Sequence, residues 1–327
     1  MLSSLLFLFV LFGLVFGKEP HVKVSKWRNN FLLGSLSVIG AQFCWSTIEI
    51  AGTFVYRGGA NPLTLLSVRY LIASIIMFLT IFIINKNWFR VKKKDIKTIS
   101  ILGLILLVHL LAFWQGIKTL NHIPTAIGVY FTFPIWIVVL SAIFRKEKIS
   151  KRKSLSLISG LIGSLFVIGF LPQLSASGVN IIGVGLMFIA AICWAVYAMV
   201  GKNLFKKYNP ITLLFYTFIF VLFGTLVLQN PTITLSQVNT VTFPNLVYMG
   251  LVCTYLAFIL FYNGVKKLKS STVGIVSYIK PILSVMLAFI ILHQTTNLTQ
   301  AIGIVLIVIS GYLIYSRKGI KDESTIY

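Results

Sequence analysis

The sequence predicts an all-α integral membrane protein of ten transmembrane helices, arranged as two inverted five-helix repeats. Three observations predict this fold class: the composition, the distribution of basic residues, and an internal repeat. Of the 327 residues, 57% are hydrophobic and only 11% are charged, with a mean hydropathy of +0.94. Soluble domains are about 45–50% apolar and about 25% charged, so this composition is typical of a chain embedded in a bilayer. Ten spans of about 20 residues leave only short connectors, which excludes a large extramembrane enzyme domain.

Long apolar runs mark the helices, and turn residues such as Asn61-Pro62 and Asn209-Pro210 mark the connectors. The predicted spans are 31–55, 62–85, 98–117, 123–144, 154–171, 181–201, 210–228, 244–264, 272–292 and 298–316. We expect five segments: an apolar and then basic N-terminal extension (1–30), a first repeat up to the linker before its fifth helix (31–153), that helix with its outer loop (154–180), a second repeat (181–316) and a tail (317–327).

The charge balance predicts the orientation of these spans. There are 29 Lys and Arg against 6 Asp and Glu, a formal net charge of +23. The basic residues stand in short bursts between apolar runs, so no continuous basic face is available for nucleic acid. If the connectors alternate sides, 25 basic residues fall on one side and only Arg57 and Lys118 on the other. By the positive-inside rule both ends of the ten-helix core are cytoplasmic. Short loops and the lack of an organellar presequence favour a bacterial inner membrane.

Residues 1–17 form a short apolar stretch with no basic residue before it. Cleavage of this stretch as a secretory signal would send Lys18 to Arg28 outward and break the charge pattern. A short extra span with its N-terminus outside, or a start site placed too far upstream, remains open. We expect this segment to lie outside the fold.

The second five spans repeat landmarks of the first at an offset of 147 to 149 residues. Because each unit has an odd number of spans, the second unit inserts into the membrane upside down relative to the first. Inverted repeats are how many transporters build inward-open and outward-open states around one site. The matched landmarks are Cys44-Trp45 with Cys193-Trp194, Asn61-Pro62 with Asn209-Pro210, Gly116 with Gly264, Pro134 with Pro281, and Glu147 with Gln294.

These landmarks resemble those of the drug/metabolite transporter superfamily, and specifically its EamA-type ten-helix exporters. The resemblance covers about residues 31–316. It departs from the family pattern at Gln294, where glutamate is frequent, and at Lys280, an unusual residue before the proline. The residues that carry it are Gly40 to Ser46 (GAQFCWS), Asn61-Pro62 with Arg69, the run from Ile123 to Ile149 with Pro134 and Glu147, and Trp194, Pro281, Gly303 and Gly311 in the second half. The resemblance implies a secondary transporter of small metabolites, often an exporter, without ATP-binding machinery.

Two charged residues lie at a similar depth in the outer half of the first two spans. Glu49 and Arg69 are each about 9–10 Å below the outer boundary, counting 1.5 Å per residue. We therefore expect a direct Glu49–Arg69 pair. This pair is either structural, or it opens so that Glu49 binds a proton or a substrate ammonium group in place of Arg69.

Lys280 lies roughly 12 Å below the inner boundary, near the midplane, with no acidic residue expected at its level. A lysine in this position either snorkels toward water or neutralises an anionic group of a substrate, and we favour the second role.

The two mid-span prolines, Pro134 and Pro281, are expected to kink their helices, because each removes an intrahelical hydrogen bond. Tyr130 and Tyr278 precede Pro134 and Pro281 by about one turn and are candidates to line a substrate cavity, with apolar packing as the alternative. Trp45 and Trp194 are candidates to stack on a substrate, although most membrane tryptophans pack or anchor at the interface. His109 is expected to be a packing residue.

Other function classes fit the residues less well. An integral-membrane enzyme needs clustered acids, histidines or a nucleophile, whereas the loops offer mostly lysine and arginine. A channel needs a ring of equivalent polar residues, which is lacking. The cysteines Cys44, Cys193 and Cys253 show no paired spacing, and we expect no metal and no cofactor.

The sequence therefore predicts a secondary transporter that exports amino acids or related zwitterions by alternating access. The alternative is an exchanger of organic anions or phosphorylated metabolites, because the embedded charges sum to +1. Its partners would be a small-molecule substrate, the lipid bilayer and, as one option, a coupling proton. Direction, coupling ion and oligomeric state stay open.

Overall fold

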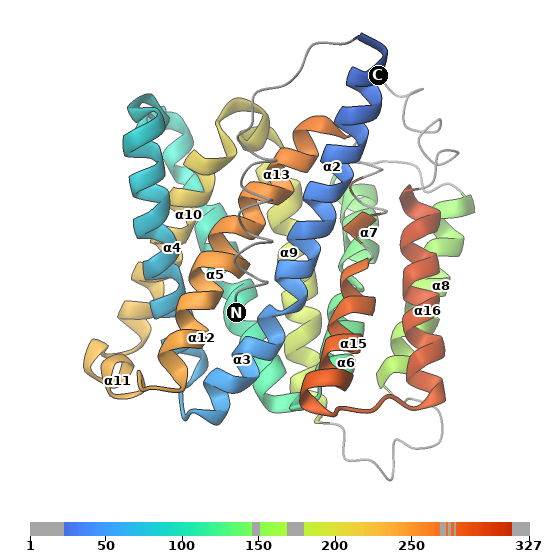
Figure 1. The fold of residues 1–327 in the computed structure, drawn as a ribbon. Coiled ribbons are helices and arrows are strands. Elements are labelled where there is room, and N and C mark those ends of the chain that lie inside the picture. Colours follow the sequence, from blue (N-terminus) through green and yellow to red (C-terminus); the bar gives the residue numbers. More distant parts are fainter. Residues whose placement is uncertain are drawn as a thin grey trace.

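The computed structural model describes residues 23–145, 151–168, 180–268, 273, 276–277 and 279–315. Every element in these ranges is helical, and no strand occurs among them. The longer helices run side by side and form one bundle (Figure 1). In chain order they are α2 (Lys23–Ser46), α3 (Ile48–Arg57), α4 (Pro62–Ile84), the 3-10 helix η1 (Lys86–Phe89), α5 (Lys93–Leu120), α6 (Ile123–Tyr130), α7 (Phe133–Arg145), α8 (Lys151–Ile168), α9 (Ile181–Lys207), α10 (Pro210–Leu228), α11 (Pro231–Ser236), α12 (Thr242–Tyr248), the π-helix η2 (Met249–Leu256), α13 (Ala257–Lys267), α15 (Ile279–Leu292) and α16 (Leu298–Tyr315). The predicted segment 1–17 and tail 317–327 lie outside the described residues.

Six of the predicted spans are confirmed as helices long and apolar enough to cross a membrane. The predicted spans 123–144, 154–171, 272–292 and 298–316 coincide with shorter described helices, so the total of ten remains a prediction. The six confirmed spans are Phe31–Arg57, Pro62–Ile84, Lys93–Leu120, Ile181–Gly201, Pro210–Leu228 and Thr242–Lys267.

The two Asn-Pro landmarks begin corresponding helices, and their chemistry explains why. Asn61 caps α4 by accepting a hydrogen bond from the Thr64 backbone N–H (2.8 Å), and Asn209 caps α10 by accepting one from Ile211 (3.0 Å). The proline that follows each asparagine occupies the first helical position, where its missing N–H costs nothing.

The exterior of the bundle is apolar, as contact with lipid requires. Large apolar side chains such as Ile83, Ile181 and Val227 are 78%, 80% and 86% exposed. In water a surface of this kind would be an aggregation liability, whereas in a bilayer it matches its surroundings. The described structure therefore supports a membrane environment.

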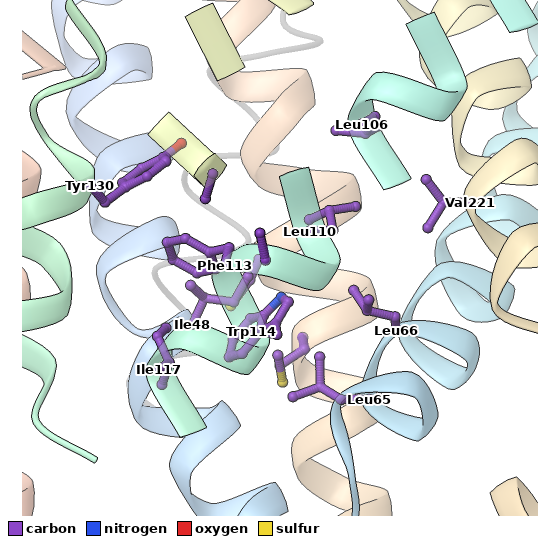
Figure 2. Packing of buried hydrophobic residues seen from close by; sticks show 14 of the residues in the cluster. Ile48, Leu65, Leu66, Leu106, Leu110, Phe113, Trp114, Ile117, Tyr130 and Val221 are labelled. Atoms are coloured by element: carbon purple, nitrogen blue, oxygen red, sulfur yellow. The ribbon is translucent and has the colours of Figure 1, made fainter. Parts of the chain in front are cut away.

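Helix α5 forms the centre of the apolar core. The fully buried Trp114 packs its ring against α3 so closely that a Cβ on Gly52 would lie 2.2 Å from its Cζ3 atom. Only glycine permits this approach of the two helices. Figure 2 shows the α5 side chains reaching toward the neighbouring helices. The labelled cluster consists of Leu106, Leu110, Phe113, Trp114 and Ile117 of α5 with Ile48, Leu65, Leu66, Tyr130 and Val221.

Helices α8 and α16 form a pair at one edge of the bundle (Figure 1). A Cβ on Gly163 would lie 2.8 Å from the backbone oxygen of Gly303, so the two backbones are in contact here. Ser159 donates a hydrogen bond to the Leu306 carbonyl (3.0 Å). Small residues with an interhelical hydrogen bond are the usual means of packing helices in lipid, where apolar burial alone gives no driving force.

Helices from the two halves of the chain interleave throughout the bundle. The main contacts between the halves pair α5 with α9, α2 with α13, α4 with α10, α5 with α10, α4 with η2, α7 with α9, α3 with α12, α2 with α15, α6 with α9, α6 with α15, and α8 with α16. Consecutive long helices run in opposite directions (Figure 1). The basic helix ends therefore gather at one end of the bundle, and Arg57 and Lys118 lie at the other end.

Candidate functional site

Two of the described helices are interrupted, and both pack against α15. The first interruption separates α2 from α3 at Thr47. Here Ser46 donates a hydrogen bond to the Gln42 carbonyl (2.7 Å) and Thr47 donates one to the Cys44 carbonyl (2.8 Å). Such hydroxyl bonds back to the preceding turn compete with the helical backbone bonds and bend helices. The bend places Glu49 in the first turn of α3, where the helix dipole favours a carboxylate.

The second interruption separates α6 from α7 at Phe131 and Thr132. Pro134 is the second residue of α7, directly after this break. A proline donates no hydrogen bond to the carbonyl four residues earlier, here that of Tyr130, and its ring crowds that carbonyl, which accounts for a break at this place. Pro281, the corresponding proline of the second half, is the buried third residue of α15.

A buried ion pair joins the two halves between these interruptions. The Nζ atom of Lys280 on α15 lies 2.6 Å from the Oε1 atom of Glu49, and the two side chains are 9% and 0% exposed. Ser284 donates to the other carboxylate oxygen of Glu49 (3.4 Å), and the Ser46 hydroxyl, which bonds the Gln42 carbonyl, also lies 3.3 Å from the Lys280 carbonyl. The ammonium group also lies 5.5 Å from the centre of the Phe131 ring at the second break. The candidate site is thus a charge pair held where two helices are discontinuous.

The predicted Glu49–Arg69 pair is wrong. Glu49 binds Lys280, while Arg69 donates from Nε to the Thr254 hydroxyl of η2 (2.5 Å). The expectation that no acid lies level with Lys280 is wrong for the same reason. Depth was counted along straight helices, and it does not say which helix face a side chain occupies: α3 packs against α15, whereas Arg69 of α4 faces the π-helix.

Tyr130 and Trp194 come together in an aromatic cluster around His109. The ring of Tyr130 lies 4.9 Å from that of Phe113 and 5.7 Å from that of His109, which in turn lies 5.3 Å from Trp194. His109 Nδ1 is 2.9 Å from the Ala190 carbonyl, so His109 has the hydrogen-bonded packing environment that we expected. Both halves of the chain contribute to this wall of the site.

Trp45 lies elsewhere, packed against Phe258 and Phe261 of α13 with ring centres 5.2 Å apart in each case. This environment is that of a packing residue. Tyr278 and Glu147 lie outside the described residues.

Sequence reasoning missed two residues of the site, Ser284 and Phe131. Ser284 follows Lys280 by four residues on a helix, a spacing that places both on one face, and this signal was available. Phe131 carries no such signal, because it reaches Lys280 only through the break between α6 and α7.

A cavity of about 190 Å³ opens at the bundle end that carries Arg57 and Lys118. Thr53, one turn beyond Glu49 on α3, lines the cavity and donates to the Glu49 carbonyl (2.9 Å). The cavity therefore approaches the buried pair to within one helical turn. Its lining residues are Thr53, Tyr56, Arg57, Ile117, Lys118, Asn121, His122, Ile123 and Gln294.

The rim of this cavity joins the α5–α6 turn to the α15–α16 turn. Gln294 accepts a hydrogen bond from the Ile123 N–H (2.9 Å), and its amide donates to the Asn121 carbonyl (3.3 Å). Burial lowers the pKa of His122, which keeps the imidazole neutral at pH 7. Its Nδ1 atom then accepts from the Thr125 N–H while Nε2 donates to the Thr295 carbonyl (3.3 Å each).

Among the described residues, no three His, Cys, Asp or Glu side chains are grouped closely enough to hold a metal ion. The chemistry that the described site offers is recognition by one acid, one base, hydroxyls and aromatic rings.

Comparisons with known proteins point to one family. The model of the EamA-like transporter family matches residues 32–169 and again residues 181–316. An uncharacterized transporter of Clostridium kluyveri is 25% identical and aligns over 87% of this chain and 94% of its own length. The uncharacterized transporter YoaV of Bacillus subtilis is 23% identical and aligns over 83% of this chain and 93% of its own length. A solved crystal structure matches 86% of this chain and 95% of its own at a TM-score of 0.60 and 20% identity, a likeness of fold alone.

Proposed function

Since the chain belongs to the EamA-like transporter family, we propose that it is a secondary transporter that exports small zwitterions by alternating access, through ten helices in two inverted repeats. The observation that carries this proposal is the buried Glu49–Lys280 pair between interrupted helices. Secondary transporters commonly bind substrate at the midplane, beside discontinuous helices and at the interface of two repeats.

The helix contacts support the inverted arrangement. Exchanging each helix for its counterpart in the other repeat converts the α5–α9 contact into the α13–α2 contact, and α7–α9 into α15–α2. The same exchange converts α5–α10 into η2–α4, and leaves α4–α10, α6–α15 and α8–α16 as pairs of counterparts. A pseudo-twofold axis in the membrane plane would produce this pattern of contacts.

The gathering of basic helix ends at one end of the bundle supports a cytoplasmic location for that end and for both core termini. The cavity with Arg57 and Lys118 would then face outward. We place the protein in a bacterial inner membrane.

The charges of the pair favour a zwitterion as substrate. Separating Glu49 from Lys280 leaves two buried charges uncompensated, at a cost of about 3–5 kcal/mol. A substrate with an ammonium and a carboxylate group supplies both missing partners at once, so such a molecule allows the pair to open without leaving either charge uncompensated. An anion would satisfy Lys280 alone, and a proton on Glu49 would have to accompany it.

Ligand-dependent thermal stabilisation of the purified protein tests this proposal, because a ligand that binds only the folded state raises Tm. The ligands are amino acids, each matched with the amine that lacks its carboxylate and the acid that lacks its ammonium: leucine with 3-methylbutylamine and 4-methylpentanoate, and phenylalanine with phenethylamine and 3-phenylpropionate. Wild type, Lys280→Met and Glu49→Gln are compared, with Arg57→Gln as a control that removes an exposed charge.

We expect stabilisation by zwitterions only, lost in both site variants and kept in Arg57→Gln. Zwitterions that stabilise wild type should also exchange across proteoliposome membranes. Stabilisation by the acids alone, lost in Lys280→Met and kept in Glu49→Gln, would contradict this substrate class and favour the second candidate, an organic-anion or phosphorylated-metabolite exchanger. That candidate is favoured by the two cations of the outer cavity.

A further inference from the structure

Arg69 is a buried cation without an acidic partner in the described part of the chain. Its side chain is on α4, the residue is 4% exposed, and the only hydrogen bond it makes to a described residue runs from Nε to the Thr254 hydroxyl. A guanidinium group keeps its proton under all physiological conditions, so it cannot escape burial by becoming neutral. A buried charge of this kind needs a counter-charge.

The π-helix η2 fixes the direction in which the guanidinium points. Thr254 donates its own hydroxyl hydrogen to the Met249 carbonyl five residues earlier (2.8 Å), which leaves the hydroxyl oxygen free to accept from Arg69. A Cβ on Gly250 would lie 3.1 Å from the Arg69 carbonyl, so η2 and α4 are in close contact. With Nε held in this way, the Nη groups present their N–H donors as a fork.

A second donor without an acceptor lies beside this fork. Trp114 Nε1 is buried and makes no hydrogen bond to any described residue, and the Trp114 ring centre lies 6.0 Å from Arg69 Cζ. Figure 2 shows the indole nitrogen on the side of the ring that faces Leu66, which precedes Arg69 by three residues on α4. The ring face of Trp114 attracts the cation, but an indole N–H only donates, so it cannot accept a hydrogen bond from Arg69.

The Arg69 Nη groups have no acceptor among the described residues, and the neighbouring Trp114 indole N–H is buried without one. We propose that Arg69 and the Trp114 indole bind one small anion, either chloride or a carboxylate group, in the half of the bundle nearer Arg57. Donor-to-ion distances of about 3 Å allow one ion to contact both groups, because Arg69 Cζ lies only 6.0 Å from the Trp114 ring centre. The Tyr70 ring, 5.0 Å from Arg69 Cζ, completes the surroundings of the cation. This site is separate from the Glu49–Lys280 pair, so it does not depend on the zwitterion proposal.

The test is a chloride titration of Tm in detergent at constant ionic strength, with sodium chloride replacing the bulky sulfonate isethionate. A parallel titration uses sodium acetate. We expect Tm of the wild type to rise and saturate, and the rise to be lost in Arg69→Gln. Trp114→Phe keeps the ring and removes one donor, so it should raise the half-saturating concentration roughly tenfold, the effect of one hydrogen bond to a charged group.

Three matched controls should leave the titration unchanged. Trp136→Phe removes another buried indole N–H without a described partner, on α7, and Arg57→Gln removes an exposed cation. Lys280→Met removes a residue of the proposed transport site and so tests whether the anion site is independent of it. If Arg69→Gln does not fold, Arg69→Lys keeps the charge and loses the fork, and its half-saturating concentration should rise.

The two titrations also identify the source of the anion. Saturation by chloride alone indicates a resident halide, and saturation by acetate as well indicates a site for a carboxylate. The proposal is overturned if Tm of the wild type does not depend on the anion, if the dependence persists in Arg69→Gln, or if Trp114→Phe and Trp136→Phe titrate alike.

Discussion

Among the described residues, two acid–lysine pairs connect the halves of this chain, and they differ in their surroundings. Glu49 and Lys280 meet in the middle of the bundle, with side chains that are 0% and 9% exposed. Asp95 and Lys207 meet at its basic end, where the side chains are 16% and 34% exposed. The chemistry is the same in both pairs, so the comparison isolates the effect of burial.

Burial changes what each pair can do. At the surface, water replaces a lost partner, and such pairs contribute little to stability. In the core a lost partner leaves a bare charge, so the pair resists opening unless another molecule supplies the counter-charges. The central pair is therefore suited to respond to a ligand, whereas the surface pair joins the start of α5 to the end of α9.

Lys280→Met should give the largest loss of stability. It leaves the Glu49 carboxylate buried with Ser284 as its remaining side-chain donor, at a cost of about 3–5 kcal/mol. Thermal unfolding in detergent measures the loss, with Lys207→Met as the matched control that removes a lysine from the surface pair. Equal losses in the two variants would contradict the role that we assign to burial.

The double variant Glu49→Gln/Lys280→Met should recover much of that loss. Neutralising both partners removes the bare charge, and buried pairs replaced as a unit are often nearly neutral in stability. We expect the double variant to be more stable than Lys280→Met by about 2 kcal/mol or more. A double variant as unstable as the sum of the single ones would mean that the two side chains act independently.

Gln229→Met tests burial without charge and should have an intermediate effect. Gln229 is 7% exposed, donates to Thr64 (2.7 Å) and Thr234 (2.9 Å), and accepts from Asn61 (2.6 Å). A methionine of similar size leaves these partners unsatisfied, at a cost of about 1–3 kcal/mol.

The loss of Tm in Gln229→Met should not depend on salt, because no ion pair is broken. Asn245→Ala is the control, since Asn245 is only half-buried and its amide donates to the Val241 carbonyl in the same helix turn. A Gln229→Met protein as stable as the control would show that the buried amide contributes little.

Local signals in the sequence were enough to predict most of the fold. The Asn61 and Asn209 caps, the six long apolar spans and the gathering of basic helix ends depend on neighbouring residues or on composition alone. Lys280 was also identified as a central residue from its depth in a span.

The partners within the site could not be predicted in this way. Depth placed Glu49 beside Arg69, but the face that each side chain takes depends on the bend at Thr47 and on the π-helix opposite α4. Which helices these two features bring together depends on contacts between residues distant in sequence, such as the Thr47–Tyr248 hydroxyl contact of 2.7 Å. A one-dimensional count along straight helices carries no information on them.

Lys207→Met should give the smallest effect, a fall in Tm of less than about 2 °C, because water solvates the Asp95 carboxylate that it leaves. Tyr208 still donates to Asp95 in this variant, so the contact between α5 and the end of α9 is weakened and not lost. The difference in Tm from wild type should shrink further between about 0.05 and 0.5 M salt, as the Debye length falls below the reach of an exposed pair.

Hydrogen bonding to Asp95 raises the pKa of Lys207. A lysine with a raised pKa stabilises the fold at pH values below its unfolded pKa of about 10.4 and loses that contribution as pH rises through the raised value. The difference should therefore be constant from about pH 7 to 9. A difference that grows with salt, or that changes within this pH range, would mean that the exposed pair behaves like the buried one.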